Sequence, residues 1–252
     1  MATHHKITLY DLKSTTINTA WSPHVWINRF ILNYKKLPYT THWVHYADQQ
    51  DFLASINAPI TRASEPRRTL PVIVDDVADG RPPALIADSS LIADYLETCY
   101  PEPSIYSGGK EAQASYVATI KKLILLDVAS VVAPNAVKLF EGRDLEFYVS
   151  SRKRLFGVEL SEMFPPEKQT AVWAQLEASF NDLSQFIDSI EHRDPWLFSM
   201  LEGPSYADFV VGGILVWFKL AGPADGWSRL EGWNGGRWTR FMANLEPYMQ
   251  VL

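Results

Sequence analysis

Two short segments carry groups whose types and spacing suit recognition of a small charged peptide. Leu70-Pro71-Val72 sets a proline before a β-branched run, where a cis peptide is plausible and would turn the main chain of Val72 outward to pair with an extended peptide. Asp88-Ser89-Ser90 sets an acid, two hydroxyls and unpaired N–H groups at a helix start, which favours a carboxylate. Together they predict a site for a peptide bearing an ammonium and a carboxylate.

The same residues also have a structural reading. Asp88 and Ser89 are ordinary N-cap residues, and Leu-Pro-Val is an ordinary strand entry. Taken alone, each segment is more typical of a helix cap or a strand entry. Their order and spacing together favour the binding site.

The elements around these segments predict a thioredoxin-like half-domain. Lys6 to Tyr10 is a strand, Pro23 begins a helix with Ser22 as its N-cap, and Thr40 to Tyr46 is a second strand. The runs 72–74 and 85–87 form a hairpin that leads into a helix starting at 88–90. A βαβ unit followed by ββα is the thioredoxin-like order.

After the proline-rich segment 100–103 the pattern becomes helical throughout. Helices are expected from Lys110 to an interruption at Pro134, from near Asp144, over 165–192, over 209–220 and from Arg237. Ser205-x-x-Asp208 is a capping-box variant that opens the most apolar of them. We therefore expect a domain over residues 1–100, a linker over 101–109 and an all-α domain over 110–252.

Composition excludes several classes of function. Lysine and arginine number 23 against 29 aspartates and glutamates, a formal charge of −6 with no basic cluster, which disfavours nucleic-acid binding. The single Cys99 rules out a disulfide framework and a cysteine-rich zinc site, and we expect it to be a buried small residue. No signal-peptide region and no membrane-spanning run is evident, which predicts a cytoplasmic protein without a membrane partner.

The order of these motifs resembles that of the cytosolic glutathione transferases over nearly the whole chain. WSPHVWINRFILNYKKLPY at 21–39 and EGWNGGRW at 231–238 are similar to the fungal FuA class and, more distantly, to the bacterial lignin β-etherases. The resemblance implies an α/β plus all-α fold, in which a thioredoxin-like βαβ-ββα domain precedes an all-helical domain. It also implies glutathione as cosubstrate, no metal, and a homodimer.

The resemblance implies a role for each motif residue. Ser22 would activate the glutathione thiol, a cis Pro71 would let Val72 pair with the cysteinyl part, and Asp88 and Ser89 would recognise the γ-glutamyl part. For Ser22 the alternative is an N-cap and nothing more.

Three positions depart from the family pattern. Ser22 stands where classes that form mixed disulfides carry cysteine, which disfavours thiol-disulfide exchange. Ile27 replaces a usual Lys or Arg, which could weaken glutathione binding, and Lys36 replaces a glycine that commonly ends the helix. The partner of the glycine carboxylate stays open among His45, Arg62, Arg67 and Arg68.

The second substrate is expected to meet the all-α domain. His24 could face it as a general acid, although a histidine in a first helical turn is more often exposed. Tyr116, Leu123 and Trp217 are candidates for the pocket wall, with core packing as the alternative for each. An aromatic content of 13% is consistent with a pocket for flat apolar ligands.

These observations predict a glutathione transferase in which Ser22 stabilises a thiolate that attacks an aromatic or other hydrophobic electrophile, as in detoxification. Two alternatives remain: a glutathione-dependent lyase, etherase or isomerase in secondary metabolism, and a non-catalytic binder of aromatic compounds. Substitution of Ser22 by alanine separates the enzymes from the binder.

Overall fold

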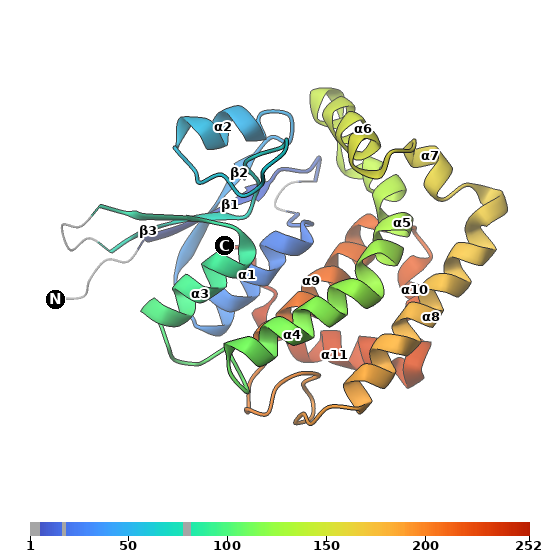
Figure 1. Ribbon diagram of the computed structural model, residues 1–252. Coiled ribbons are helices and arrows are strands. Elements are labelled where there is room, and N and C mark those ends of the chain that lie inside the picture. The colour runs from blue at the N-terminus through green and yellow to red at the C-terminus, as the bar shows by residue number, and fades with distance from the viewer. Residues whose placement is uncertain (1–5, 17–18, 78–81) are drawn as a thin grey trace. The chain divides into compact units, whose positions relative to one another are not determined.

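The computed structural model describes residues 6–16, 19–77 and 82–252 (Figure 1). The chain divides into two compact units, residues 1–104 together with 247–252, and residues 105–246. Part of the predicted hairpin turn, residues 78–81, lies outside the described residues.

A four-stranded mixed sheet forms the centre of the first unit. Its strands are β1 (Lys6–Leu12), β2 (Tyr39–Val44), β3 (Val72–Asp76) and β4 (Ala84–Ala87), in the spatial order β2-β1-β3-β4. β1 pairs with β2 in parallel, as a strand–helix–strand crossover requires, and β3 is antiparallel to both β1 and β4. β3 is therefore an inner strand with a neighbour on each side.

Three helices accompany this sheet: α1 (Pro23–Tyr34), α2 (Gln49–Ser55) and α3 (Ser89–Cys99). Figure 1 shows α1 and α3 side by side on one face of the sheet, with α2 on the other. Val25, Phe30 and Ile31 of α1 are fully buried, because the apolar residues recur at helical spacing and meet the sheet. This packing fixes where both helices begin.

The last six residues of the chain belong to this unit. The Asn33 side chain donates to the Tyr248 carbonyl at 2.7 Å, and the Tyr39 hydroxyl donates to the Gln250 carbonyl at 3.0 Å. The Thr41 N–H donates to the Leu252 carbonyl at 2.9 Å, which covers the edge of β2.

The second unit is helical. Its helices are α4 (Lys110–Ile120), α5 (Leu126–Asn135), α6 (Gly142–Phe156), α7 (Leu160–Met163), α8 (Gln169–Asp188), α9 (Tyr206–Ala221), α10 (Gly226–Leu230) and α11 (Arg237–Leu245). Shorter turns are the π-helical η1 (Lys121–Leu125) between α4 and α5, and the 3-10 turns η2 (Ala136–Leu139), η3 (Pro166–Lys168) and η4 (Trp233–Gly236). A last 3-10 turn, η5 (Glu246–Tyr248), begins at the end of this unit and continues into the segment that belongs to the first unit. The predicted end of the long helix near Pro134 is correct within one residue, whereas α7 and α10 were not predicted.

Helix α9 is the core of the second unit, and its predicted capping box is confirmed. Ser205 and Asp208 cap each other reciprocally, and both are fully buried. Asp208 also accepts hydrogen bonds from the N–H groups of Leu197 and Phe198, at 2.7 and 3.2 Å. Burial raises the pKa of Asp208, and these hydrogen bonds oppose that rise.

The predicted combination of a thioredoxin-like half and an all-helical half is confirmed. No helix in the described part of the chain is long and apolar enough to span a bilayer. The expectation for Cys99 was wrong: it lies exposed at the last position of α3, because the buried face of that helix carries Ile92, Ala93 and Leu96 instead.

Candidate glutathione site

Ser22 lies at the N-cap of α1 with an extended backbone, and Pro23 occupies the first helical position, as predicted. Its hydroxyl makes no capping hydrogen bond, although the side chain is only 5% exposed. An N-cap serine normally bonds an N–H of the first turn. The reading of Ser22 as a cap alone therefore loses its main support, and the hydroxyl remains available to donate elsewhere.

The loop before Ser22 is held against its own helix. The indole N–H of Trp26 donates to the Ala20 carbonyl at 2.7 Å, and the Ser22 carbonyl accepts from the Trp26 N–H at 3.0 Å. Trp26 is 3% exposed, so both bonds lie in a dry environment. Trp26 thereby restrains Ser22 from both sides.

The Leu70–Pro71 peptide is cis, as the sequence suggested. The role expected for the Val72 main chain was wrong, however. Val72 pairs with Tyr10 of β1 and with Ala87 of β4, so its strand has no open side. The residue on the other side of the cis bond, Leu70, has no main-chain hydrogen bond within the described residues, and it lies outside the ladder. Of the two residues that flank Pro71, Leu70 is therefore the one whose main chain lies outside the sheet pairing.

Asp88 caps α3 with its side chain. Oδ1 accepts from the N–H of Ser90 at 2.8 Å and from the Ser90 hydroxyl at 2.6 Å. Asp88 has a φ of +84°, a conformation that costs a residue with a side chain on the order of 1–3 kcal/mol and that clusters at ligand sites.

Ser89 leaves its N–H and its hydroxyl available within the described residues. Its N–H is the first of α3, and the Asp88 cap reaches only the N–H groups of Ser90 and Leu91. Its hydroxyl has no hydrogen-bond partner among the described residues, and the side chain is half-buried. A free N–H and a free hydroxyl at the positive end of a helix form a favourable site for a carboxylate.

Two hydrogen bonds bring the predicted segments together. The Asn28 side-chain amide, on the second turn of α1, donates to the Ser89 carbonyl at 3.0 Å. The Asp88 N–H donates to the Pro71 carbonyl at 3.3 Å. The helix that Ser22 opens, the start of α3 and the cis-proline corner are thus directly joined.

Position 27 of α1 is an isoleucine instead of a cation, but Arg29 lies two residues later on the same helix. Its guanidinium is fully buried and forms a 2.8 Å ion pair with Asp11, and it donates to the Thr41 hydroxyl at 3.0 Å. Burial raises the pKa of Asp11, and the adjacent guanidinium works against that rise. Arg29 therefore ties α1 to the sheet, and Ile27 is itself buried at 3% exposure.

The candidates for the glycine carboxylate have different surroundings. Arg68 donates through Nε to the Ala58 carbonyl at 2.8 Å, so it holds the loop after α2. His45 is exposed and lies 3.3 Å from the Lys13 ammonium. Arg62 and Arg67 are exposed on the same loop.

The candidates for the second substrate lie on several elements. His24 is half-buried in the first turn of α1. In the helical unit Tyr116 of α4 packs its ring against Phe198, with ring centres 5.5 Å apart, which supports the packing alternative for this residue. Leu123 is half-buried in the π-helical turn η1, a feature often found at functional sites. The indole N–H of Trp217 on α9 is buried without a partner in the described part of the chain.

Sequence reasoning missed Leu70 and Asn28. Leu70 becomes the candidate only when β3 is known to be an inner strand, because such a strand leaves only the residue before the cis proline available. Asn28 gave no signal, since an asparagine inside a helix has no defined partner until the tertiary contact is known.

Comparisons with known proteins identify the family of this chain. A sequence profile described as "Glutathione S-transferase, N-terminal domain" matches residues 21–99, and one described as "Glutathione S-transferase, C-terminal domain" matches residues 112–248. A curated relative, the glutathione S-transferase-like protein ustS of Aspergillus flavus, is 31% identical over 217 residues, which cover 82% of this chain and 78% of the relative.

Two solved structures resemble the chain over nearly its full length. A glutathione S-transferase of Ceriporiopsis subvermispora, solved in complex with glutathione, is 30% identical with a TM-score of 0.87, over 98% of both chains. The glutathione transferase GSTFuA3 of Phanerochaete chrysosporium is 27% identical with a TM-score of 0.86, again over 98% of both chains. The resemblance to the fungal FuA class is thereby supported, and the chain belongs to the glutathione S-transferase family of enzymes.

Proposed function

We propose that this protein is a serine-type glutathione transferase in which the Ser22 hydroxyl donates a hydrogen bond to the glutathione sulfur and favours the thiolate. The observation that carries the proposal is the Ser22 hydroxyl, which sits at the N-cap of α1 without capping it. The thiolate then attacks an electrophilic carbon, a C–S bond forms, and the leaving group departs with its electron pair.

The magnitudes suffice for this role. A free thiol has a pKa of about 8.5, so a few per cent is ionised at pH 7. A hydrogen bond to a charged sulfur contributes about 1.5–3 kcal/mol, and the α1 dipole about 0.3–1 kcal/mol. At about 1.36 kcal/mol per pKa unit, the thiol pKa falls by roughly one to three units. No general base is needed, because the site only has to prefer the anion.

The rest of the peptide has matching groups in the first unit. We assign the main-chain pairing with the cysteinyl part to Leu70, held in place by the cis Pro71, with Val72 anchoring the corner in the sheet. The γ-glutamyl carboxylate would accept hydrogen bonds from the N–H and the hydroxyl of Ser89. The γ-glutamyl ammonium would form an ion pair with the Asp88 carboxylate. The Ceriporiopsis relative solved with glutathione supports this choice of peptide.

We further propose that the helical unit supplies the second substrate's pocket, and that the substrate is an aromatic or other hydrophobic electrophile. The buried indole N–H of Trp217 supports this, because an unpaired donor costs about 1–3 kcal/mol and an acceptor on a ligand would recover it. The π-helical turn at Leu123 supports the same region. A homodimer, as in related transferases, belongs to this proposal.

The test compares Ser22→Ala with Ser55→Ala. The Ser55 hydroxyl donates to its own helix at Phe52, so its removal controls for loss of a helix-associated hydroxyl in the same unit. Conjugation of glutathione to 1-chloro-2,4-dinitrobenzene and to a panel of aromatic electrophiles should fall at least tenfold in S22A and stay unchanged in S55A. Full conjugating activity in S22A would show that Ser22 is not the activating group.

A further inference from the structure

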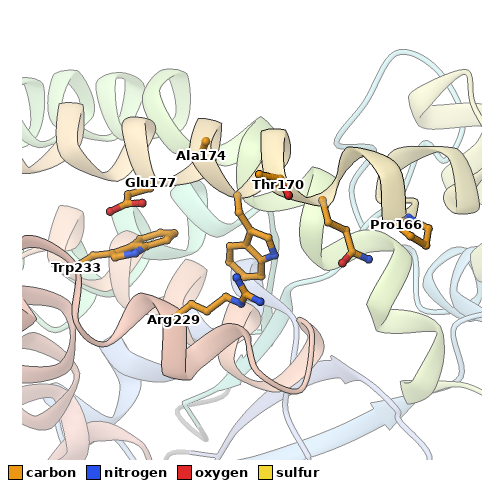
Figure 2. A pocket seen from close by; sticks show the side chains of 8 residues that line it. Pro166, Thr170, Ala174, Glu177, Arg229 and Trp233 are labelled. Carbon is orange, nitrogen blue, oxygen red and sulfur yellow. The ribbon is translucent and has the colours of Figure 1, made fainter.

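A cavity lies wholly within the helical unit. It has a volume of about 570 Å³ and is bounded by α8 on one side and by α10 and η4 on the other (Figure 2). This volume is in the range of small-molecule sites. None of the residues assigned to glutathione or to the second substrate lines it.

Two indoles give the cavity its apolar surface. Trp173 is only 9% exposed and forms the floor. The half-buried Trp233 meets it nearly edge-on, with ring centres 6.3 Å apart and planes at 76°. Phe180 supports Trp233 from behind, with ring centres 5.6 Å apart. The two rings are therefore held in place. Trp233 offers most of the open apolar surface, because the Arg229 guanidinium lies over the Trp173 ring.

The positive charge of the cavity is already engaged. The guanidinium of Arg229 lies over the Trp173 ring, 4.9 Å from its centre, and its Nε donates to the Asp225 carboxylate at 2.7 Å. This hydrogen bond holds the pKa of Asp225 below its usual range, and the ion pair lies at the exposed side of the cavity wall. Arg229 thus lines the cavity, and the Asp225 carboxylate largely balances its charge.

The negative charge is not engaged. Glu177 lies one helical turn after Trp173 on α8 and projects into the Trp233 side of the cavity (Figure 2). Its carboxylate has no hydrogen-bond or ion-pair partner within the described residues. The cavity therefore combines aromatic surface with one unbalanced carboxylate.

We propose that this cavity binds an arylalkylamine, with the protonated amine between Glu177 and Trp233 and the flat ring along the apolar wall that the two indoles form. A carboxylate attracts the ammonium directly, and an indole face adds a cation–π attraction. An aromatic acid would place its charge against Glu177 and would have to displace Asp225 from Arg229. The hydroxyl of Thr170 supplies a further polar contact at the rim.

The experiment is isothermal titration of the whole protein with tryptamine, tryptophol and indole-3-acetate, which share one ring and differ in charge. Tryptamine should bind at least tenfold more tightly than indole-3-acetate, with tryptophol between them. Glu177→Gln should weaken tryptamine at least fivefold. Asp182→Asn, which removes another exposed carboxylate of α8, should leave it unchanged.

Location is checked by the indole N–H signals in an NMR spectrum of the same samples. Tryptamine should shift the signals of Trp173 and Trp233, assigned with Trp233→Phe, in the presence of saturating glutathione. No binding of tryptamine, tighter binding of indole-3-acetate, or equal losses in the two carboxylate variants would each overturn the proposal. None of these outcomes bears on the role of Ser22.

Discussion

The side-chain amide of Asn28 donates a 3.0 Å hydrogen bond to the carbonyl of Ser89, across 61 residues of sequence. Asn28 is fully buried on the helix that Ser22 begins, and Ser89 is the first residue of α3. One side chain therefore sets the distance between the proposed thiol-activating group and the proposed γ-glutamyl site.

Asn28→Ala should raise the KM for glutathione about fivefold with a small change in kcat. One neutral hydrogen bond contributes about 1 kcal/mol, and its loss loosens the γ-glutamyl end rather than the sulfur end. Steady-state kinetics at varied glutathione check this. Asn33→Ala, which loses its bond to the Tyr248 carbonyl instead, is the control and should leave KM unchanged. A fall in kcat alone would contradict the assignment.

Ser89→Ala should weaken glutathione binding by about five- to tenfold, because the hydroxyl is a free donor at a helix start that favours carboxylates. Ser90→Ala should have a smaller effect, since the Ser90 hydroxyl already donates to Asp88. Titration calorimetry with glutathione measures both. The account fails if the two variants bind equally well or if S90A is the weaker one.

Lys35→Met should destabilise the protein by about 3 kcal/mol, at the lower end expected for a broken buried pair. The Lys35 ammonium is fully buried and donates to Glu97 at 2.8 Å and to the carbonyls of Tyr100 and Pro103, so it joins the ends of α1 and α3. Urea unfolding reports the change. A loss below 1 kcal/mol would show that these bonds are replaced by water.

Lys36→Gly should stabilise the protein by about 1 kcal/mol. Lys36 is exposed and has a φ of +53°, a left-handed conformation that glycine adopts without strain. A lysine in this conformation therefore costs stability relative to glycine. The same unfolding assay should show a higher midpoint at unchanged slope, and a lower midpoint would mean that the Lys36 side chain makes a compensating contact.

Most of the fold could be predicted from local sequence patterns. The Ser22-Pro23 helix start, the cis Pro71 and the Ser205–Asp208 capping box each depend on a few neighbouring residues, and each was predicted. The turns η1 and η4 were missed because a π turn and a left-handed pair at Asn234 and Gly235 leave the apolar spacing nearly unchanged.

Long-range relationships could not be read in the same way. Strand order decides that β3 is an inner strand, so the sequence led to Val72 where the structure leads to Leu70. The return of residues 247–252 to the first unit depends on carbonyls that every residue carries, and therefore has no sequence signature.

The most direct test of the central claim is the pKa of the bound glutathione thiol, measured from the ultraviolet absorbance of the thiolate across pH in the wild-type protein and in Ser22→Ala. The account predicts a pKa at least one unit below the free value of about 8.5 in the wild-type protein and a return toward that value in the variant. Glutathione that binds with an unshifted thiol pKa, or with the same lowered pKa in both proteins, would contradict it.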